Sequence, residues 1–173
     1  MSFSSEVKEE LFNHIGKSRH CQIAEMAAIM AWESDNSLTD EKKYILFRRL
    51  CDTESIDGTS MQKMYEAVKM WDHEAGIPIL RDTVDGLLIQ QGCCKRAYIR
   101  GAFLASGSIS DPEKSYHFEI VCHTMGQARQ LQEVINSFDM DAKIVERKKH
   151  FVVYLKEGSQ IVDILNVMEA HIA

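Results

Sequence analysis

Two apolar segments without helix breakers place the tightest limit on how this chain folds. They span residues 20–33 and 93–106, and both carry small side chains at four-residue spacing. Residues four apart share a helix face, and small side chains there let two helix backbones approach closely. The pattern predicts two buried helices packed against each other, although ordinary core packing of alanine-rich helices would give the same spacing. The predicted contact residues are Ala24, Ala28, Ala97, Gly101 and Ala105.

The remainder of the first half has helical periodicity with short connections. The connections between its predicted helices are too short to hold a two-stranded hairpin, at residues 34–39 and 52–59. Gly76 and Pro78 then interrupt the helical pattern. The first half is therefore predicted to be mostly helical. Its further expected elements are helices over 3–15, 40–51 and 60–71, followed by a less regular helix or loop over 79–91.

The second half mixes strands with helices. Polar and apolar residues alternate over 115–122, which predicts a half-buried strand. The β-type runs 141–149 and 150–156 abut, so a tight hairpin is expected between them. Helical periodicity returns over 126–138 and 159–171. The whole chain is thus predicted to be α+β.

Composition narrows the protein class. A chain of 173 residues with 45% hydrophobic residues has enough apolar surface for a substantial core. Its five cysteines, an odd number that includes one vicinal pair, indicate reduced thiols in the cytoplasm rather than a disulfide framework. The first residues lack the pattern of a signal peptide, and no apolar run approaches membrane-spanning length. We expect a cytoplasmic protein without a membrane partner.

Several longer runs resemble known proteins. YIRGAFLASGSI resembles the signature helix of LAGLIDADG proteins, in which this helix forms the interface between repeats and ends in an acidic metal ligand. HCQIAEMAA, CCKRAYIRGAFLASGSISDPEKSYHFEIVC and KIVERKKHFVVYLKEGSQIVDILNVMEAH resemble the WhiA family of Gram-positive bacteria. The resemblance is nearly continuous over residues 92–173.

This resemblance implies a LAGLIDADG homing-endonuclease-like fold made of two pseudo-repeats, at residues 1–91 and 92–173. It also implies a nucleoid-associated transcription regulator of sporulation and cell division. Two departures weaken the expectation of strong DNA binding. The first repeat lacks room for most of its sheet, and the chain stops at Ala173, before the linker and helix-turn-helix domain that WhiA proteins carry.

Nuclease chemistry in this fold needs an acidic residue at the end of each paired helix to hold a divalent metal ion. By the resemblance, the metal-binding Asp of the signature falls on Ser106 and the preceding Asp on Leu104. A hydroxyl cannot replace a carboxylate there. Glu33 holds the equivalent position in the first helix, where a solvated helix-end residue is the favoured interpretation. The chain is predicted to be no enzyme, and a residual metal-dependent endonuclease using Glu33 is the least favoured alternative.

Histidine and cysteine residues offer candidate zinc ligands, but their spacing lacks CxxC and HxxxH motifs. Buried reduced thiols are favoured, and the sequence predicts neither a metal nor a cofactor. The candidate ligands considered are His20, Cys21, Cys93, Cys94, Cys122 and His123.

A basic hairpin is the remaining functional candidate. The net charge of −6 disfavours strong nucleic-acid binding, yet the acidic excess lies in residues 1–89, whereas residues 90–173 are neutral overall. In LAGLIDADG proteins the sheet face contacts DNA, so weak binding of double-stranded DNA is predicted. Because Glu146 and Glu157 dilute the basic strip, a solvated charged face is an equal alternative. The predicted DNA-contacting residues are Lys143, Arg147 and Lys149 on one strand and His150, Tyr154 and Lys156 on the next.

A different class of function is also compatible with the sequence. The acidic first half would repel phosphate, which favours a protein-interaction or dimerisation module without DNA affinity of its own. Its partner would be another protein or, in longer family members, the C-terminal helix-turn-helix.

Overall fold

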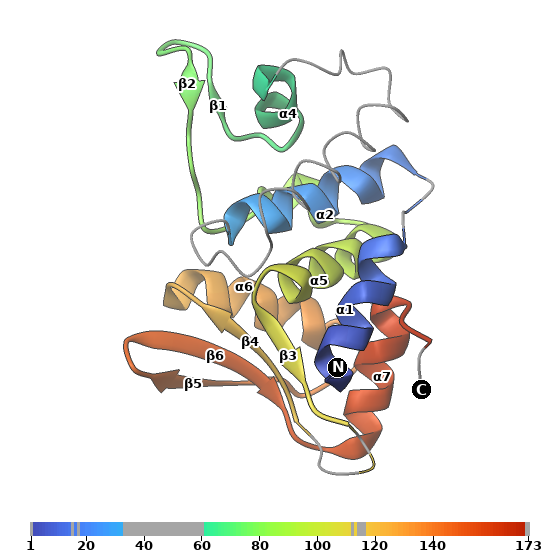
Figure 1. Cartoon of the computed structure of the whole chain (residues 1–173). Helices are drawn as coiled ribbons and strands as arrows, with labels where there is room; N and C mark the ends of the chain where they lie inside the picture. The colour runs from blue at the N-terminus through green and yellow to red at the C-terminus, as the bar shows by residue number, and fades with distance from the viewer. Residues whose placement is uncertain are drawn as a thin grey trace.

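A four-stranded antiparallel sheet carries a layer of helices on one of its faces. One long helix of that layer lies side by side with a second long helix, which is farther from the sheet (Figure 1). The computed structural model describes residues 2–14, 16, 18–32, 61–111, 113 and 117–171. The helices are α1 (Phe3–Asn13), α2 (Arg19–Ala31), α4 (Met61–Ala67), the 3-10 helix η2 (Gly86–Ile89), α5 (Gly92–Ser106), α6 (Met125–Asn136) and α7 (Gly158–Met168). The strands are β1 (Trp71–Asp72), β2 (Ile77–Pro78), β3 (Gly107–Ile109), β4 (Phe118–Cys122), β5 (Lys143–Arg147) and β6 (His150–Leu155).

The predicted helix pair corresponds to α2 and α5, which pack along each other. A Cβ atom added at Gly101 would lie 2.5 Å from the Glu25 carbonyl oxygen and 3.0 Å from the Cβ of Ala28. Only glycine therefore permits this separation of the two backbones. Ala24, Ala28 and Ala97 are fully buried, and Ala105 is 4% exposed. The structure thus places all five small residues in the core, with Gly101 directly against α2.

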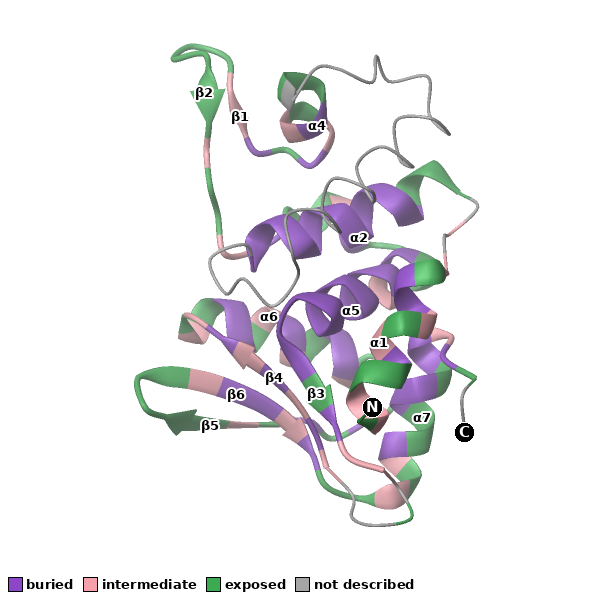
Figure 2. Cartoon of the chain, viewed as in Figure 1, coloured by how far each residue is buried: buried purple, intermediate pink, exposed green. Residues whose placement is uncertain are grey.

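The four-stranded sheet has the order β3-β4-β6-β5. Alternate residues of β4, among them Phe118 and Ile120, are fully buried and pair with buried Leu155 and Val153 of β6. These side chains share one face of the sheet because side-chain direction alternates along a strand. Helices α1, α5 and α6 contact the strands, and α7 packs on α5. Figure 2 shows the resulting continuous core between the sheet and the helices.

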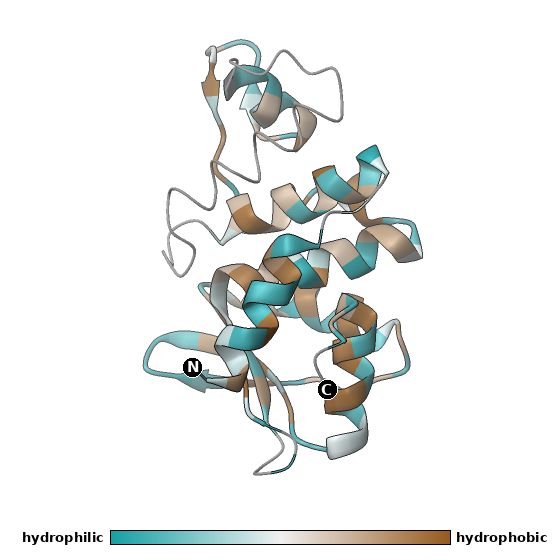
Figure 3. Ribbon diagram, turned by 45° about the vertical axis from the view of Figure 1, so that its right-hand side comes forward, coloured by the Kyte–Doolittle hydropathy of each residue, from teal (hydrophilic) through white to brown (hydrophobic). Residues whose placement is uncertain are grey.

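The β5–β6 connection is a two-residue turn formed by Lys148 and Lys149, with φ of 52° and 69°. Two consecutive left-handed residues match the twist of an antiparallel hairpin, as in a type I′ turn. The tight hairpin is therefore present. Lys149, however, lies in the turn and not on β5. The strand was predicted to end at Lys149, two residues after its observed end at Arg147. Figure 3 shows mainly hydrophilic residues around this hairpin tip, and hydrophobic residues along α7.

The first half differs from its predicted helices after Ala67. Helix α4 ends there because Lys69 adopts φ of 60°, and Trp71, the predicted last residue of the helix, instead begins β1. Strands β1 and β2 form a two-stranded hairpin whose turn includes Gly76 at φ of 69°. The uncertain segment 79–91 is mostly loop, with the short helix η2.

Several predictions fall on residues outside the described part of the chain. They are the helix over 40–51, the short connections 34–39 and 52–59, and the side chain of Glu33. In the part that is described, no helix combines the length and apolarity needed to cross a membrane.

Candidate functional site

The outer face of the sheet, opposite the helices, gathers most of the predicted DNA-contacting side chains. Lys143 of β5 pairs with Tyr154 of β6, and Arg147 pairs with His150. All four positions alternate with inward-facing residues and therefore lie on the outer face. Lys156 follows β6, with its ammonium 5.4 Å from the centre of the Tyr154 ring. Lys149 sits at the exposed hairpin tip.

Acidic residues neutralise part of this outer face. Arg147 donates a hydrogen bond of 2.6 Å to Glu119 of β4, and His117 lies 2.7 Å from the same carboxylate. Partial burial acts to raise the pKa of Glu119, but the hydrogen bonds and charges of Arg147 and His117 outweigh it and lower the pKa. Glu119 is thus held in its charged form. Its side chain is 13% exposed, whereas that of Arg147 is 53% exposed and can reach solvent or a ligand.

The other end of the strip is also paired. Lys143 lies 3.0 Å from the carboxylate of Asp141, and both side chains are exposed. Exposed ion pairs contribute at most about 1 kcal/mol, so an incoming phosphate can replace the carboxylate as partner. Lys143 can therefore exchange its carboxylate partner for a phosphate. A groove of about 410 Å³ borders the hairpin there, lined by Val121, Arg147, Lys148, His150 and Val152.

The C-terminal ends of α2 and α5 converge on one backbone carbonyl. The Ser106 hydroxyl and the Trp32 indole N–H each donate a hydrogen bond of 3.0 Å to the oxygen of Val121. Ser106 is 9% exposed, and Leu104 is 1% exposed and belongs to the core. At the position where the resemblance expects an acidic metal ligand, the hydroxyl thus contributes to packing the helix end on β4.

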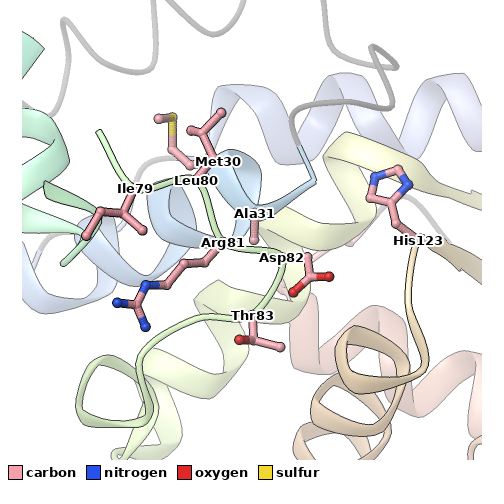
Figure 4. Close-up of a pocket in the computed structure, with 8 residues that line it drawn as sticks. All are labelled: Met30, Ala31, Ile79, Leu80, Arg81, Asp82, Thr83 and His123. Carbon is pink, nitrogen blue, oxygen red and sulfur yellow. The ribbon is translucent and has the colours of Figure 1, made fainter. Parts of the chain in front are cut away.

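A cavity of about 660 Å³ opens beside this end of the helix pair (Figure 4). Met30 and Ala31 of α2, the segment 79–83 and His123 line it. Asp82, the one carboxylate among the described lining residues, accepts a hydrogen bond of 2.8 Å from the Thr124 hydroxyl. The described lining therefore resembles a structural junction more than a site that gathers carboxylates around an ion.

A buried glutamine holds this junction together. Gln127 is fully buried, and its amide nitrogen donates to the carbonyls of Ala31 and Asp82 at 3.1 and 2.7 Å. Its amide oxygen accepts from the His123 backbone N–H at 2.8 Å. The three bonds join α2, the 79–83 segment and α6. Sequence reasoning missed Gln127 because a glutamine within an amphipathic helix gives no sign of burial.

Sequence reasoning also missed a buried ion pair inside the helix pair. Arg100 of α5 is 2% exposed and hydrogen-bonds through Nε to Glu25 of α2, which is 6% exposed. Nη1 of Arg100 also lies 3.3 Å from Glu169, which in turn lies 2.7 Å from His14. Burial raises the pKa of Glu25 more than Arg100 lowers it. The available signal was a charged residue, Glu25 or Arg100, in the middle of each largely apolar segment.

Four of the six candidate zinc ligands come together at the opposite end of the helix pair. The ligand atoms of His20, Cys21, Cys93 and Cys94 all lie within 4.8 Å of one another. Burial, followed by the neighbouring Cys93 and Cys94 thiols, raises the pKa of Cys21 to about 12. Cys122 and His123 do not belong to this group, which is the only such ligand cluster in the described ranges. The spacing in sequence had argued against a cluster that the helix pairing creates.

The paired small-residue helices above an antiparallel sheet define a LAGLIDADG-like domain. The family model of the WhiA LAGLIDADG-like domain matches residues 95–173. The crystal structure of the N-terminal LAGLIDADG domain of DUF199/WhiA covers 99% of this chain and 94% of its own, with a TM-score of 0.68 and 17% identity. Full-length DUF199/WhiA from Thermatoga maritima covers 99% of this chain, with a TM-score of 0.71 and 17% identity, over 63% of its own length.

Relatives of higher sequence identity carry the same family name. A probable cell division protein WhiA from Lachnoclostridium phytofermentans is 42% identical, in an alignment that covers 99% of this chain and 66% of the relative. Its namesake from Alkaliphilus oremlandii is 39% identical, covering 100% and 66%. This chain belongs to the WhiA family. It spans just under two thirds of the length of these relatives.

Proposed function

We propose that this chain is a non-catalytic, DNA-associated regulatory domain of the WhiA type, acting at the nucleoid in the control of cell division and sporulation. The relatives' name supports the link to cell division. The observation that carries the DNA association is the outer face of the sheet, where Lys143, Arg147, His150 and Tyr154 lie in register opposite the helix layer. Cationic side chains on an exposed sheet face can contact successive phosphates.

The proposed absence of nuclease action rests on the end of α5. By the resemblance, Ser106 takes the place of the metal-binding Asp of the signature, and its hydroxyl donates a hydrogen bond to the Val121 carbonyl. A neutral hydroxyl supplies neither the charge nor the paired carboxylate oxygens that hold a divalent ion at a phosphate. The fold would thus provide a binding platform without cleavage.

Binding of this chain to duplex DNA across a salt series tests the proposal. The logarithm of the binding constant should fall linearly with the logarithm of salt concentration, with a slope of about −0.9 for each phosphate contact. Arg147→Ala/Lys149→Ala should weaken binding and reduce the magnitude of that slope by about 2. Lys63→Ala/Arg129→Ala, which removes equal charge from exposed positions on α4 and α6, should leave the slope nearly unchanged.

Glu119→Gln gives the opposite test on the same face. It removes the carboxylate that occupies Arg147 and should therefore strengthen DNA binding several-fold. Equal slopes for the hairpin variant and its control would contradict DNA binding at the outer face.

The ion pairs on this face favour one alternative function. Arg147 and Lys143 already have acidic partners, as they would on a surface that meets another protein rather than phosphate. Salt-insensitive self-association or partner binding, with no retention on DNA at low salt, would replace the DNA platform by a protein-interaction module. A second protein or the helix-turn-helix of longer family members would then be the partner.

A further inference from the structure

We propose that His20, Cys21, Cys93 and Cys94 form a structural zinc site that joins the N-terminal ends of α2 and α5. The two helices lie side by side and run in the same direction (Figure 1). Their first turns meet at this cluster, and their C-terminal ends meet at the Val121 carbonyl. Each helix contributes one adjacent pair of ligands from its first turn. The site therefore links the two pseudo-repeats and is independent of the DNA-binding proposal.

The distances suit a four-coordinate ion. Zinc binds sulfur at about 2.3 Å and histidine nitrogen at about 2.0–2.1 Å, so ligand atoms at the corners of a tetrahedron lie about 3.4–3.8 Å apart. Here all four ligand atoms lie within 4.8 Å of one another, and Nε2 of His20 is 3.2 Å from Sγ of Cys93. Small side-chain rotations would bring them to bonding geometry around one centre.

The ligand chemistry selects a soft or borderline cation. Three thiolates and one imidazole are a typical ligand set of structural zinc sites, whereas magnesium and calcium require oxygen ligands. On binding, the cation displaces the thiol protons to solvent, so no oxidant or reductant is needed.

The surroundings combine enclosure with access. Cys94 is 4% and Cys21 is 9% exposed, whereas His20 and Cys93 face solvent, which gives an ion a route of entry. The chain before α2 covers the buried side: a Cβ atom at Gly16 would lie 3.3 Å from the Cβ of Cys21, and Gln22 donates to the Gly16 carbonyl at 2.6 Å.

Titration of the reduced chain with Co²⁺, followed by displacement with Zn²⁺, tests the site. One Co²⁺ per chain should bind with the intense visible bands of tetrahedral coordination and the near-ultraviolet band of cobalt–thiolate bonds. Zn²⁺ should abolish both spectra and raise the melting temperature, since a ligand that binds the native state stabilises it. His20→Ala and Cys93→Ser should each lower the Zn²⁺ affinity at least tenfold.

Matched controls separate ligand loss from misfolding. His73→Ala removes an exposed histidine, and Cys122→Ala removes a buried thiol, both outside the cluster. These variants should keep the tetrahedral spectrum and the one-to-one stoichiometry. His20 and Cys93 are exposed, so their variants should retain the metal-free circular dichroism of the parent chain.

Three outcomes would overturn the zinc site. The first is an octahedral cobalt spectrum without thiolate bands. The second is an affinity that His20→Ala and Cys93→Ser leave unchanged relative to the controls. The third is a disulfide between Cys21 and Cys93 or Cys94 that forms under air in the presence of excess Zn²⁺, which would make the cluster a redox pair instead.

Discussion

The two halves of the molecule build their structure in different ways. The second half encloses its apolar residues between a four-stranded sheet and helices α5, α6 and α7. In the described part of the first half, α2 is buried along its length, whereas α4 and the two-residue strands β1 and β2 lie on the far side of α2 from the sheet (Figure 1). Ile77 and Leu80 there are 56% and 67% exposed.

Among the described elements, α2 packs mainly on α5 of the second half. These contacts include Gly101, Arg100 and the cluster of His20, Cys21, Cys93 and Cys94. A helix buried on most sides is stabilised by tertiary packing rather than by its own propensity. We therefore expect α2 to unfold together with the second half, and the β1–β2 hairpin to open independently.

Amide hydrogen exchange should give the largest contrast between the halves. The amides of β4 and β6 lie in the core sheet and exchange only on global unfolding, whereas the β1–β2 amides open locally. Exchange in β1–β2 should be faster by about a thousandfold or more, given global stabilities of about 5–15 kcal/mol for such domains. Mass spectrometry or NMR at native pH measures this. Equal protection of β1–β2 and of β4 and β6 would contradict the expected contrast between the halves. So would exchange of the α2 amides at the rate of β1–β2.

Replacement of the buried arginine should produce the next largest effect. Arg100→Met leaves Glu25 buried without its partner and should lower the free energy of unfolding by about 3–5 kcal/mol in chemical denaturation. Arg129→Met at an exposed position of α6 should change it by about 0.5 kcal/mol or less. Glu25→Met/Arg100→Met should be more stable than Arg100→Met alone, because no charge stays buried. A loss below about 1 kcal/mol for Arg100→Met would show that the ion pair adds little.

Overpacking of the helix pair should have a somewhat smaller effect. Gly101→Leu forces α2 and α5 apart and should lower the free energy of unfolding by about 1–3 kcal/mol. Gly86→Leu is the control, because a Cβ atom at Gly86 meets nothing within 4 Å. Thermal unfolding of both variants measures the difference. A near-normal melting temperature for Gly101→Leu would show that the helices separate at little cost.

Local sequence patterns predicted the elements whose burial repeats regularly. Four-residue spacing identified the helix pair through Ala24, Ala28 and Gly101, and alternation identified the β5–β6 hairpin with Lys143 and Arg147 on one face. The prediction for Lys149 was wrong because Lys148 and Lys149 fit the strand alternation but form the turn. Helix α4 was predicted too long because apolar Val68 and Trp71 keep a helical period where the backbone turns at Lys69.

The sequence by itself determined the α+β class, the close helix pairing and the basic hairpin, since each follows from side-chain periodicity within one segment. Only the tertiary structure decided that Arg100 pairs with Glu25, that Glu119 neutralises Arg147, and that His20 and Cys21 meet Cys93 and Cys94. These partners lie 28 or more residues apart along the chain. Their meeting depends on the register with which α2 packs on α5 and β4 pairs with β6, which local periodicity does not specify.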